Sequence, residues 1–298
     1  MPICVIFNPA ARGNKARHFR RYLDEMGGSA AFKATAAPGD ARRLAAEAVR
    51  DGFDVIAAAG GDGTVNEVLN GIGDAKGFGR TRFGVLPLGT VNVFARDLKI
   101  PLRLKSAWEV LRHGNERIVD VPQVEFSENG NAKKQYFIQL AGAGLDARAI
   151  ELVSWSQKKK IGPLAYVVAG LKALREKNPK IQAREDSKPA QSPLEGELVL
   201  IGNGRYYGGS FNVFPEADFN DGLLDVCIFP RTDFGTLLRC GPDILLRLRL
   251  PESKVKRFRA ASFELSGDST AAFQLDGEGI GKLPAKFSIT GEKLRVIC

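Results

Sequence analysis

Three glycines and one aspartate interrupt an apolar run in the segment VIAAAGGDGTVNEV, residues 55–68. The apolar residues before the turn predict a buried strand, and the apolar spacing after it predicts a helix. A helix that follows a glycine turn presents unpaired backbone N–H groups, and the missing side chains let a phosphate approach the backbone. The segment therefore favours an anion site at the start of this helix, where Thr64 and Glu67 also fit a capping box.

A second segment, PLGTVNVFARDL at residues 87–98, repeats the Gly-Thr-Val-Asn of residues 63–66 after another strand-like run. Two equivalent turns at the carboxyl ends of neighbouring parallel strands can hold successive phosphates of one nucleotide. The alternative is that the glycines only make tight turns between strands and helices. The repeat favours the phosphate interpretation.

Acidic residues gather in two later turns. PEADFNDGLLDV holds Asp218, Asp221 and Asp225 around a glycine, and carboxylates with neighbouring carbonyls suit a hard cation such as Mg²⁺. FQLDGEG holds Asp276 and Glu278 two residues apart across a turn, where one carboxylate suits a general base for a hydroxyl. Asn, Asp and Gly also favour plain hairpin turns, and the spacing leaves that alternative open.

Several other kinds of site are disfavoured. The only histidines, His18 and His113, lie outside any glycine-rich or acidic context, which argues against a Ser/His or Cys/His nucleophile. The four cysteines have no CxxC spacing and are interpreted as buried thiols. No GxxxxGK[ST] segment is present, so a P-loop is excluded. GAGLDA at residues 142–147 matches G-x-G-x-x-A but lacks the acidic residue downstream of a dinucleotide site.

The elements that must position these turns change character along the chain. In the first 115 residues or so, four strand-like runs alternate with helical segments, which predicts a parallel sheet covered by helices. The predicted strands are residues 3–7, 30–36, 53–59 and 83–88, and the predicted helices are Ala16–Met26, Asp40–Arg50, Val65–Ile72 and Val91–Leu98.

From about Arg117 onward, short segments of alternating polarity predict an antiparallel β-sandwich. Its predicted strands are residues 117–126, 135–144, 195–204, 222–229, 261–267, 271–277, 285–290 and 293–297, with helices at Asp146–Lys177 and Phe234–Leu248. We therefore predict an α/β chain with an N-terminal parallel-sheet nucleotide-binding domain at residues 1–117. A C-terminal antiparallel β-sandwich domain is predicted at residues 118–298.

The net charge of +9 and the pI near 9.4 favour anionic partners. No apolar run reaches the roughly 18 residues of a membrane span, and the N-terminus reads directly into a strand, so a cytoplasmic location is expected. Residues 155–170 and 245–259 combine cations with apolar side chains, as membrane-surface segments do, although a solvated protein face is the alternative. The cations do not interleave with aromatic residues, so nucleic-acid binding is not expected.

Taken in order, GGDGT, the opening NPAARGNKA, PLGTVN and the two acidic turns resemble the diacylglycerol kinase catalytic-domain family, which includes bacterial lipid kinases and sphingosine kinases. AGAGLDA, KKKIGPLAY and GNGRYYGGSFNVFPEADFNDGLLDV extend the resemblance over almost the whole chain. It implies a nucleotide-binding α/β domain followed by a β-sandwich, with the active site in the cleft between them. It also implies an ATP-dependent lipid kinase that uses Mg²⁺ and contacts an anionic membrane surface peripherally.

The resemblance further implies roles for individual residues. The nucleotide would be surrounded by Asn8, Thr35, Gly60, Gly61, Asp62, Gly63, Thr64, Val65, Asn66 and Thr90. Mg²⁺ would be bound by Asp218, Asp221 and the carbonyl of Leu223, and Glu278 would be the base with Asp276 beside it. Many bacterial members have an acid where this chain has Val93. Either Asp62 and Asp221 supply that carboxylate, or the nucleotide metal is held differently.

The acceptor is expected to be a hydroxyl of a diacylglycerol-like or sphingoid lipid, and a homodimer is compatible with the sequence. Two other functions stay open. A NAD kinase-like phosphotransferase shares GGDGT and a related two-domain plan, although no second nucleotide-recognition motif is visible. A nucleotide-binding sensor without catalysis is the other, because Val93 replaces the common acid.

Overall fold

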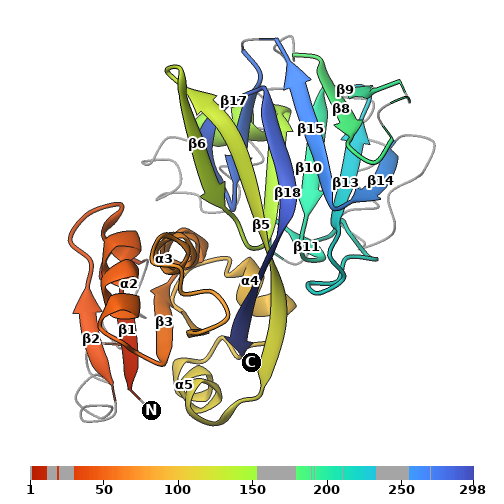
Figure 1. Cartoon of the computed structure of the whole chain (residues 1–298). Coiled ribbons are helices and arrows are strands. Elements are labelled where there is room, and N and C mark those ends of the chain that lie inside the picture. Colours follow the sequence, from red (N-terminus) through yellow and green to blue (C-terminus); the bar gives the residue numbers. More distant parts are fainter. Residues whose placement is uncertain are drawn as a thin grey trace.

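The computed structural model describes residues 2–11, 19, 30–152, 179–188, 190, 192–209, 211–232, 255–268 and 270–298. Within these residues the chain forms an α/β part and a β-sandwich part, which meet along two long shared strands (Figure 1). Apart from Phe19, the predicted helix Ala16–Met26 lies outside the described residues, as do residues 153–177 of the predicted helix Asp146–Lys177 and the whole predicted helix Phe234–Leu248.

The α/β part is built on four parallel strands in the order β2-β1-β3-β4. Their bounds are β1 Ile3–Phe7, β2 Ala31–Ala34, β3 Val55–Gly60 and β4 Arg82–Pro87. Strands β1 and β3 are buried along their whole length, as expected for parallel strands that are covered on both faces. This confirms the parallel sheet predicted from the alternating pattern.

Helices cover this sheet, and three of the four lie close to predicted positions. They are α2 Asp40–Arg50, α3 Asp62–Asp74, α4 Val93–Asp97 and α5 Leu104–His113. Helices α2 and α3 pack on each other and on β1 and β3, while α5 packs on β4. The bounds of α2 are as predicted, whereas α5 was not predicted.

Helix α3 begins three residues before its predicted start. Gly61 is in an extended conformation and is the N-cap, so Asp62 and Gly63 belong to the first helical turn. The predicted capping box is wrong: the Thr64 hydroxyl accepts a hydrogen bond from Asn8 Nδ2 at 3.1 Å. Glu67 instead accepts the backbone N–H of Ala41, at the start of α2, at 3.0 Å.

The sandwich part packs two sheets face to face around a phenylalanine-rich core that includes Phe137, Phe263, Phe273 and Phe287. One sheet has the order β14-β13-β10-β7-β16-β17, and its strands are antiparallel. Its bounds are β7 Leu140–Gly144, β10 Leu198–Gly202, β13 Leu224–Phe229, β14 Lys256–Ala260, β16 Ala272–Leu275 and β17 Glu278–Lys282. The antiparallel sandwich predicted for the second half of the chain is therefore present.

The facing sheet continues from the parallel strands of the α/β part. Its further strands are β5 Glu116–Glu128, β6 Asn131–Tyr136, β8 Ile181–Glu185, β9 Leu194–Gly196, β15 Ser262–Gly267 and β18 Ala285–Ile297. A two-stranded ribbon is formed by β11 Tyr206–Tyr207 and β12 Phe211–Asn212, and α6 Leu145–Leu152 follows β7.

Strand β18 joins the two parts. It pairs with β15 near its start and runs parallel to β4 at its end, while β5 pairs with it over nearly its whole length. The predicted strands 285–290 and 293–297 are thus one strand, with an irregular register between Ile289 and Lys293. Leu294 and Val296 lie in the core of the α/β part. A domain boundary at residues 117 and 118 stays a prediction, because β5 runs across it without a break.

Candidate active site

Four turns follow the carboxyl ends of the parallel strands and lie at one edge of the sheet. Asn8 follows β1, Thr35 follows β2, and the glycine turns at Gly60 and Gly89 follow β3 and β4. Hydrogen bonds tie neighbouring turns together, from Asn8 N–H to Ala59 O at 3.0 Å and from Thr35 N–H to Phe7 O at 2.9 Å. This edge is where ligands bind in open α/β sheets, and most of the residues predicted around the nucleotide lie along it, with Val65 and Asn66 as exceptions.

The two glycine turns are in direct backbone contact. A Cβ atom on Gly61 would lie 3.3 Å from Gly89 Cα, and one on Gly89 would lie only 2.5 Å from Gly61 Cα. Gly60 has a different neighbour, because a Cβ there would lie 2.3 Å from Thr64 Oγ1. Side chains are therefore excluded where these turns meet, and the predicted juxtaposition of the two glycine motifs is confirmed.

The first turn of α3 has the geometry of an anion site. Its first helical hydrogen bond runs from Val65 N–H to Gly61 O at 3.0 Å, so the N–H groups of Asp62, Gly63 and Thr64 lie outside the helical ladder. These groups and the positive end of the helix dipole favour a phosphate. Thr64 Oγ1 and Asn8 Nδ2 lie beside them.

The second glycine turn is not equivalent to the first. Asn92 is in the left-handed conformation, with φ 52°, and its Nδ2 donates to Gly89 O at 2.8 Å. The N–H of Val93, at the start of α4, donates to Asp62 Oδ1 at 2.7 Å. A carboxylate of the chain itself thus occupies the start of this short helix, and the expectation of two equivalent phosphate sites is corrected. Thr90 is exposed beside this turn.

Asp62 is a half-buried carboxylate held between the two turns. Burial raises its pKa to about 6, repulsion from Asp276 adds to the rise, and the hydrogen bond from Val93 N–H opposes it. Val93 stands where many bacterial members have an acid, and Asp62 and Asp221 are the two acids that could supply the missing carboxylate. Asp62 accepts the N–H of Val93, whereas Asp221 pairs with Arg259.

Asp62→Asn is expected to raise the free energy of unfolding by about 1–3 kcal/mol at pH 7.5 and by much less at pH 4.5. The amide oxygen still accepts the Val93 N–H, and the buried charge is gone. A carboxyl whose folded pKa is raised binds its proton more tightly in the folded state, so its ionisation lowers stability as the pH rises from about 4 to about 6. Urea unfolding of both proteins at the two pH values measures the difference.

Asp40→Asn is the control with the opposite sign. The N–H groups of Ala36 and Ala37 and the Arg43 guanidinium lower the pKa of Asp40, so the wild-type carboxylate should be the more stable form at pH 7.5. A stability gain from Asp62→Asn that is equal at both pH values would contradict the raised pKa of Asp62.

Asp276 uses both carboxylate oxygens to hold the turn in place. It accepts the N–H groups of Ile138, Gln139 and Leu140, each at 3.0 Å, and Asn66 Nδ2 at 2.7 Å. Burial raises the pKa of Asp276, whereas these four N–H donors lower it and favour the ionised form. Because a carboxylate has about four lone-pair positions, no acceptor position is left for a substrate hydroxyl. Asp276 is thus placed to position the turn.

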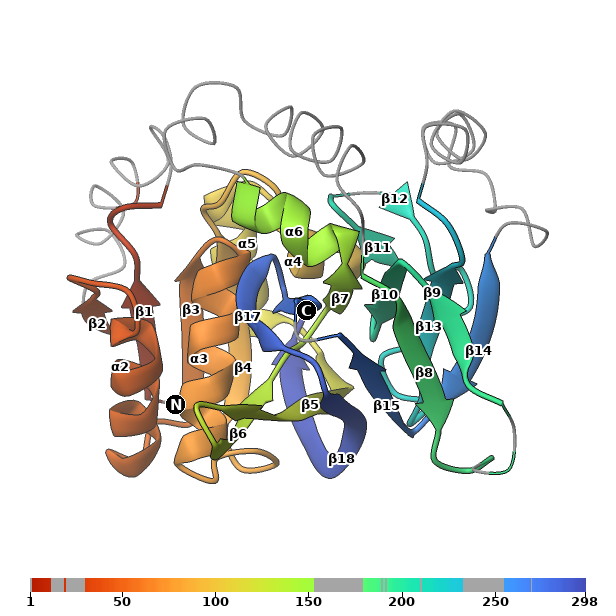
Figure 2. The same cartoon turned by 90° about the horizontal axis from the view of Figure 1, so that it is seen from above.

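Glu278 lies opposite the first turn of α3. Its side chain is exposed at the start of β17, and a Cβ on Gly63 would lie 2.5 Å from Glu278 Oε1. In the view from above in Figure 2, β17 of the sandwich part projects next to α3 of the α/β part, and the side chain of Glu278 spans to Gly63. The structure therefore brings the predicted base and the predicted phosphate turn together from residues more than 200 positions apart in the sequence.

Two of the predicted nucleotide residues make contacts within the protein. Val65 is buried in the core, and Asn66 donates to Asp276 and to Tyr136 O. One helical turn later, Asn70 Nδ2 donates to Tyr136 O and Asn70 Oδ1 accepts the N–H of Tyr136, each at 2.9 Å. These asparagines join α3 to the sandwich part, and a direct role for Val65 or Asn66 in nucleotide binding stays a prediction.

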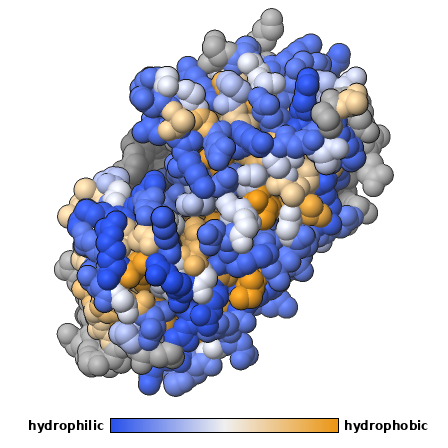
Figure 3. Space-filling view, viewed as in Figure 1, coloured by the Kyte–Doolittle hydropathy of each residue, from blue (hydrophilic) through white to orange (hydrophobic). Residues whose placement is uncertain are grey.

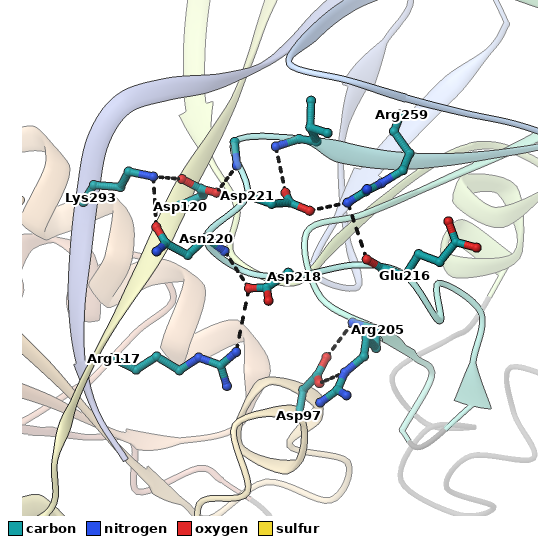
Figure 4. Close-up of polar contacts among 12 residues, drawn as sticks. Asp97, Arg117, Asp120, Arg205, Glu216, Asp218, Asn220, Asp221, Arg259 and Lys293 are labelled. Carbon is teal, nitrogen blue, oxygen red and sulfur yellow. Dashed lines mark hydrogen bonds and ion pairs between the residues drawn. The ribbon is translucent and has the colours of Figure 1, made fainter.

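The acidic turn at residues 215–223 is bound by arginines (Figure 4). Asp221 pairs with the guanidinium of Arg259, which also contacts Asp225 at 3.1 Å. Asp218 Oδ1 accepts the backbone N–H of Asn220 at 3.0 Å and lies 3.8 Å from Arg117 Nη2. Within the described residues, Asp218 and Asp221 therefore form ion pairs with arginines, and neither carboxylate forms a hydrogen bond with the glycine turns.

Two carboxylates and a carbonyl are chemically suited to Mg²⁺, but a cation at Asp221 would share this carboxylate with Arg259 and with the backbone N–H of Leu223. In the part of the chain that the structure describes, no three His, Cys, Asp or Glu side chains gather as a metal cluster. Metal ligation by Asp218, Asp221 and Leu223 stays a prediction.

Buried carboxylates that the sequence did not reveal anchor the two parts. Asp97, on α4, accepts Gln139 Nε2 at 3.0 Å and pairs with Arg205 Nε at 3.2 Å. Asp120 pairs with Lys293 and accepts the Gly222 N–H at 2.8 Å (Figure 4). Both carboxylates are almost completely buried, yet the sequences around them, ARDL at residues 95–98 and IVDV at residues 118–121, resemble ordinary half-exposed segments. No local signal marks them.

A parallel α/β sheet joined to an antiparallel sandwich is found over the whole length of a known structure. The crystal structure of a diacylglycerol kinase from Bacillus anthracis str. Sterne matches with a TM-score of 0.71 at 21% identity, covering 99% of this chain and 96% of that one. At this identity the likeness establishes the fold.

Sequence comparison establishes the family. The family described as "Diacylglycerol kinase catalytic domain" matches residues 2–124, and the "YegS C-terminal NAD kinase beta sandwich-like domain" matches residues 139–298. "Diacylglycerol kinase" of Bacillus subtilis (strain 168) is 33% identical over 95% of this chain and 91% of its own. "Probable lipid kinase YegS-like" of Pseudomonas aeruginosa (strain UCBPP-PA14) is 35% identical over 91% of this chain and 85% of its own. The chain belongs to the diacylglycerol kinase catalytic-domain family.

Proposed function

We propose that this protein is an ATP-dependent lipid kinase that phosphorylates a hydroxyl of a diacylglycerol-like or sphingoid lipid. The position of Glu278 over Gly63, at the start of α3, is the observation that carries this proposal. It puts a carboxylate next to the N–H groups that suit a phosphate, so an acceptor hydroxyl between them would meet both a base and a phosphoryl group. The names of the B. subtilis and P. aeruginosa relatives support a lipid acceptor.

In the proposed reaction the hydroxyl oxygen of the lipid attacks the γ-phosphorus of ATP. A new O–P bond forms, the bond from the γ-phosphorus to the bridging oxygen breaks, and ADP leaves. The hydroxyl proton passes to the carboxylate of Glu278, while the first turn of α3 holds the phosphates. When bound with ATP, Mg²⁺ would supply positive charge to the phosphate oxygens, and Asp62 is the residue of this chain that we propose would hold it.

Access to the lipid is proposed to involve contact with an anionic membrane surface, which the net charge of +9 favours. None of the helices in the described residues is long and apolar enough to cross a membrane. On the face shown in Figure 3, hydrophobic residues form small separate areas among hydrophilic ones.

Most of the two stretches predicted to touch the membrane lies outside the described residues. Within the described part of residues 245–259, Lys256 is exposed. Arg257 instead donates to Val213 O at 3.2 Å, and Arg259 pairs with Asp221 and Asp225. These two arginines therefore have partners inside the protein, and Lys256 is the better candidate for contact with lipid headgroups.

The test is transfer of label from γ-labelled ATP to a panel of acceptors. Diacylglycerol, phosphatidylglycerol, ceramide and a sphingoid base are presented in mixed vesicles, and NAD is presented in solution. We expect label in one lipid class, a rate that needs Mg²⁺, and no label in NAD. Label in NAD alone would establish the NAD kinase-like alternative, and tight ATP binding without transfer to any acceptor would establish the sensor alternative. Either result overturns the proposal.

A further inference from the structure

Gln274 lies directly behind the turn that carries Glu278. It is on β16, where the pairing with β17 shifts register between Phe273 and Gln274, and its side chain is buried. Such bulges re-aim side chains and are common beside active sites. Here the Gln274 Oε1 accepts the N–H of Gly277, the residue between Asp276 and Glu278, at 2.8 Å.

A buried carboxylate fixes the orientation of this amide. Gln274 Nε2 donates to Asp146 Oδ2 at 2.7 Å, and the other oxygen of Asp146 accepts the hydroxyl of Tyr207. Because the backbone N–H of Gly277 can only donate, the amide oxygen of Gln274 must face it, and the NH₂ group then faces Asp146. Burial raises the pKa of Asp146, whereas the hydrogen bonds from Tyr207 and Gln274 lower it. Asp146 is buried at the start of α6.

The segment GAGLDA makes room for this carboxylate. A Cβ on Gly142 would lie 1.9 Å from Asp146 Oδ2, closer than any two such atoms can approach. Gly142 is also the partner of Gln274 in the pairing of β7 with β16. The segment GAGLDA lacks the acidic residue of a dinucleotide site, but its Gly142 leaves the space in which Asp146 reaches the side chain of Gln274.

We propose that Asp146 and Gln274 are positioning residues that aim Glu278 at the start of α3. Asp276 and Gly277 both have positive φ, 48° and 90°, as in the two-residue Asp-Gly turn of a β-hairpin, and hydrogen bonds from outside the hairpin fix where this turn lies relative to α3. Asp276 is held by its four N–H donors, and Gln274 holds the next peptide group. This inference rests on the proposed function, in which Glu278 is the base.

Gln274→Met is the decisive variant, because it keeps a long side chain and removes both amide hydrogen bonds. We expect kcat for lipid phosphorylation to fall by about 10- to 100-fold, since small errors in the position of a catalytic group are costly. The KM for ATP should stay within about twofold, because the glycine turns are untouched. Leu265→Ala, in the sandwich core, is the control for a loss of stability alone.

A double-mutant cycle separates positioning from a general structural role. In a Glu278→Gln background, Gln274→Met should change the residual rate by less than about twofold, because it acts through Glu278. The same fold-loss in both backgrounds would overturn the proposal, and so would an unchanged kcat in the single variant.

Amide hydrogen exchange tests the same contact without any turnover. The Gly277 N–H should exchange slowly in the wild type and at least about tenfold faster in Gln274→Met. If the wild type phosphorylates no lipid, the proposed function fails while this measurement still decides the role of Gln274. Equal exchange rates at Gly277 in the two proteins would contradict the positioning role.

Discussion

Glu278→Gln is expected to lower the rate of lipid phosphorylation by about 10³-fold and to leave ATP affinity within about threefold of the wild type. General-base catalysis contributes about 10²- to 10⁴-fold, and an amide cannot take the proton of the acceptor hydroxyl. Asp276 is close by but cannot substitute, because its four acceptor positions are filled by Asn66 and three backbone N–H groups. Initial rates with the best acceptor of the panel and calorimetric ATP titration measure the two effects.

Glu264→Gln is the matched control, because Glu264 is an exposed carboxylate on β15 in the same part of the molecule. It should leave the rate unchanged. A Glu278→Gln enzyme that keeps more than a tenth of the wild-type rate would show that another group takes the proton. The site would then need a different base, although the phosphate turns could stand.

Gly89→Ala is expected to weaken ATP binding by at least about 30-fold. The added Cβ would lie 2.5 Å from Gly61 Cα and 2.7 Å from Asn92 Oδ1. Because the nearer atom belongs to the backbone, the two glycine turns must move apart, and the N–H groups at the start of α3 move with them. Calorimetry with Mg²⁺ and ATP, together with the thermal midpoint, gives both the affinity and the cost to the fold.

Gly291→Ala provides the comparison, since a Cβ at Gly291 would meet no atom within 4 Å. Its ATP affinity should equal that of the wild type. If Gly89→Ala also binds ATP normally, the contact between the glycine turns has no part in holding the nucleotide. The second glycine motif would then serve only the turn after β4.

Short-range patterns of apolar and polar residues predicted the strands and helices of the α/β part well. Runs of Val, Ile and Ala predicted the strands that form the buried sheet, and the amphipathic pattern of residues 40–50 predicted α2 with its observed bounds. The repeated Gly-Thr-Val-Asn predicted that two glycine turns meet, and they touch at Gly61 and Gly89. In each case the pattern that predicts the element lies within one short stretch of the chain.

Contacts between distant residues could not be predicted in the same way. Asp62 lies in the glycine motif and reads as a phosphate or metal residue, yet its carboxylate binds the N–H of Val93. Asp276 reads as a second acid of a catalytic pair, yet it binds backbone groups 136 to 138 positions earlier in the chain. Such partners are set by how the sandwich docks on the α/β part, which no local pattern encodes.

The acidic turn shows a similar limit. Its composition suits a metal, but Arg259 comes from a strand 38 positions later and pairs with Asp221. Lys293 comes from β18 and pairs with Asp120 under the same turn. Carboxylates that cluster in one stretch of sequence are therefore paired in the folded protein with cations from other strands.

A crystal structure of the protein with a non-hydrolysable ATP analogue and Mg²⁺ would locate the phosphates relative to α3 and Glu278. We expect phosphate oxygens about 3 Å from the N–H groups of Asp62, Gly63 and Thr64, with the γ-phosphate on the side of Glu278. Phosphates bound away from the start of α3, or a γ-phosphate pointing away from Glu278, would contradict this expectation.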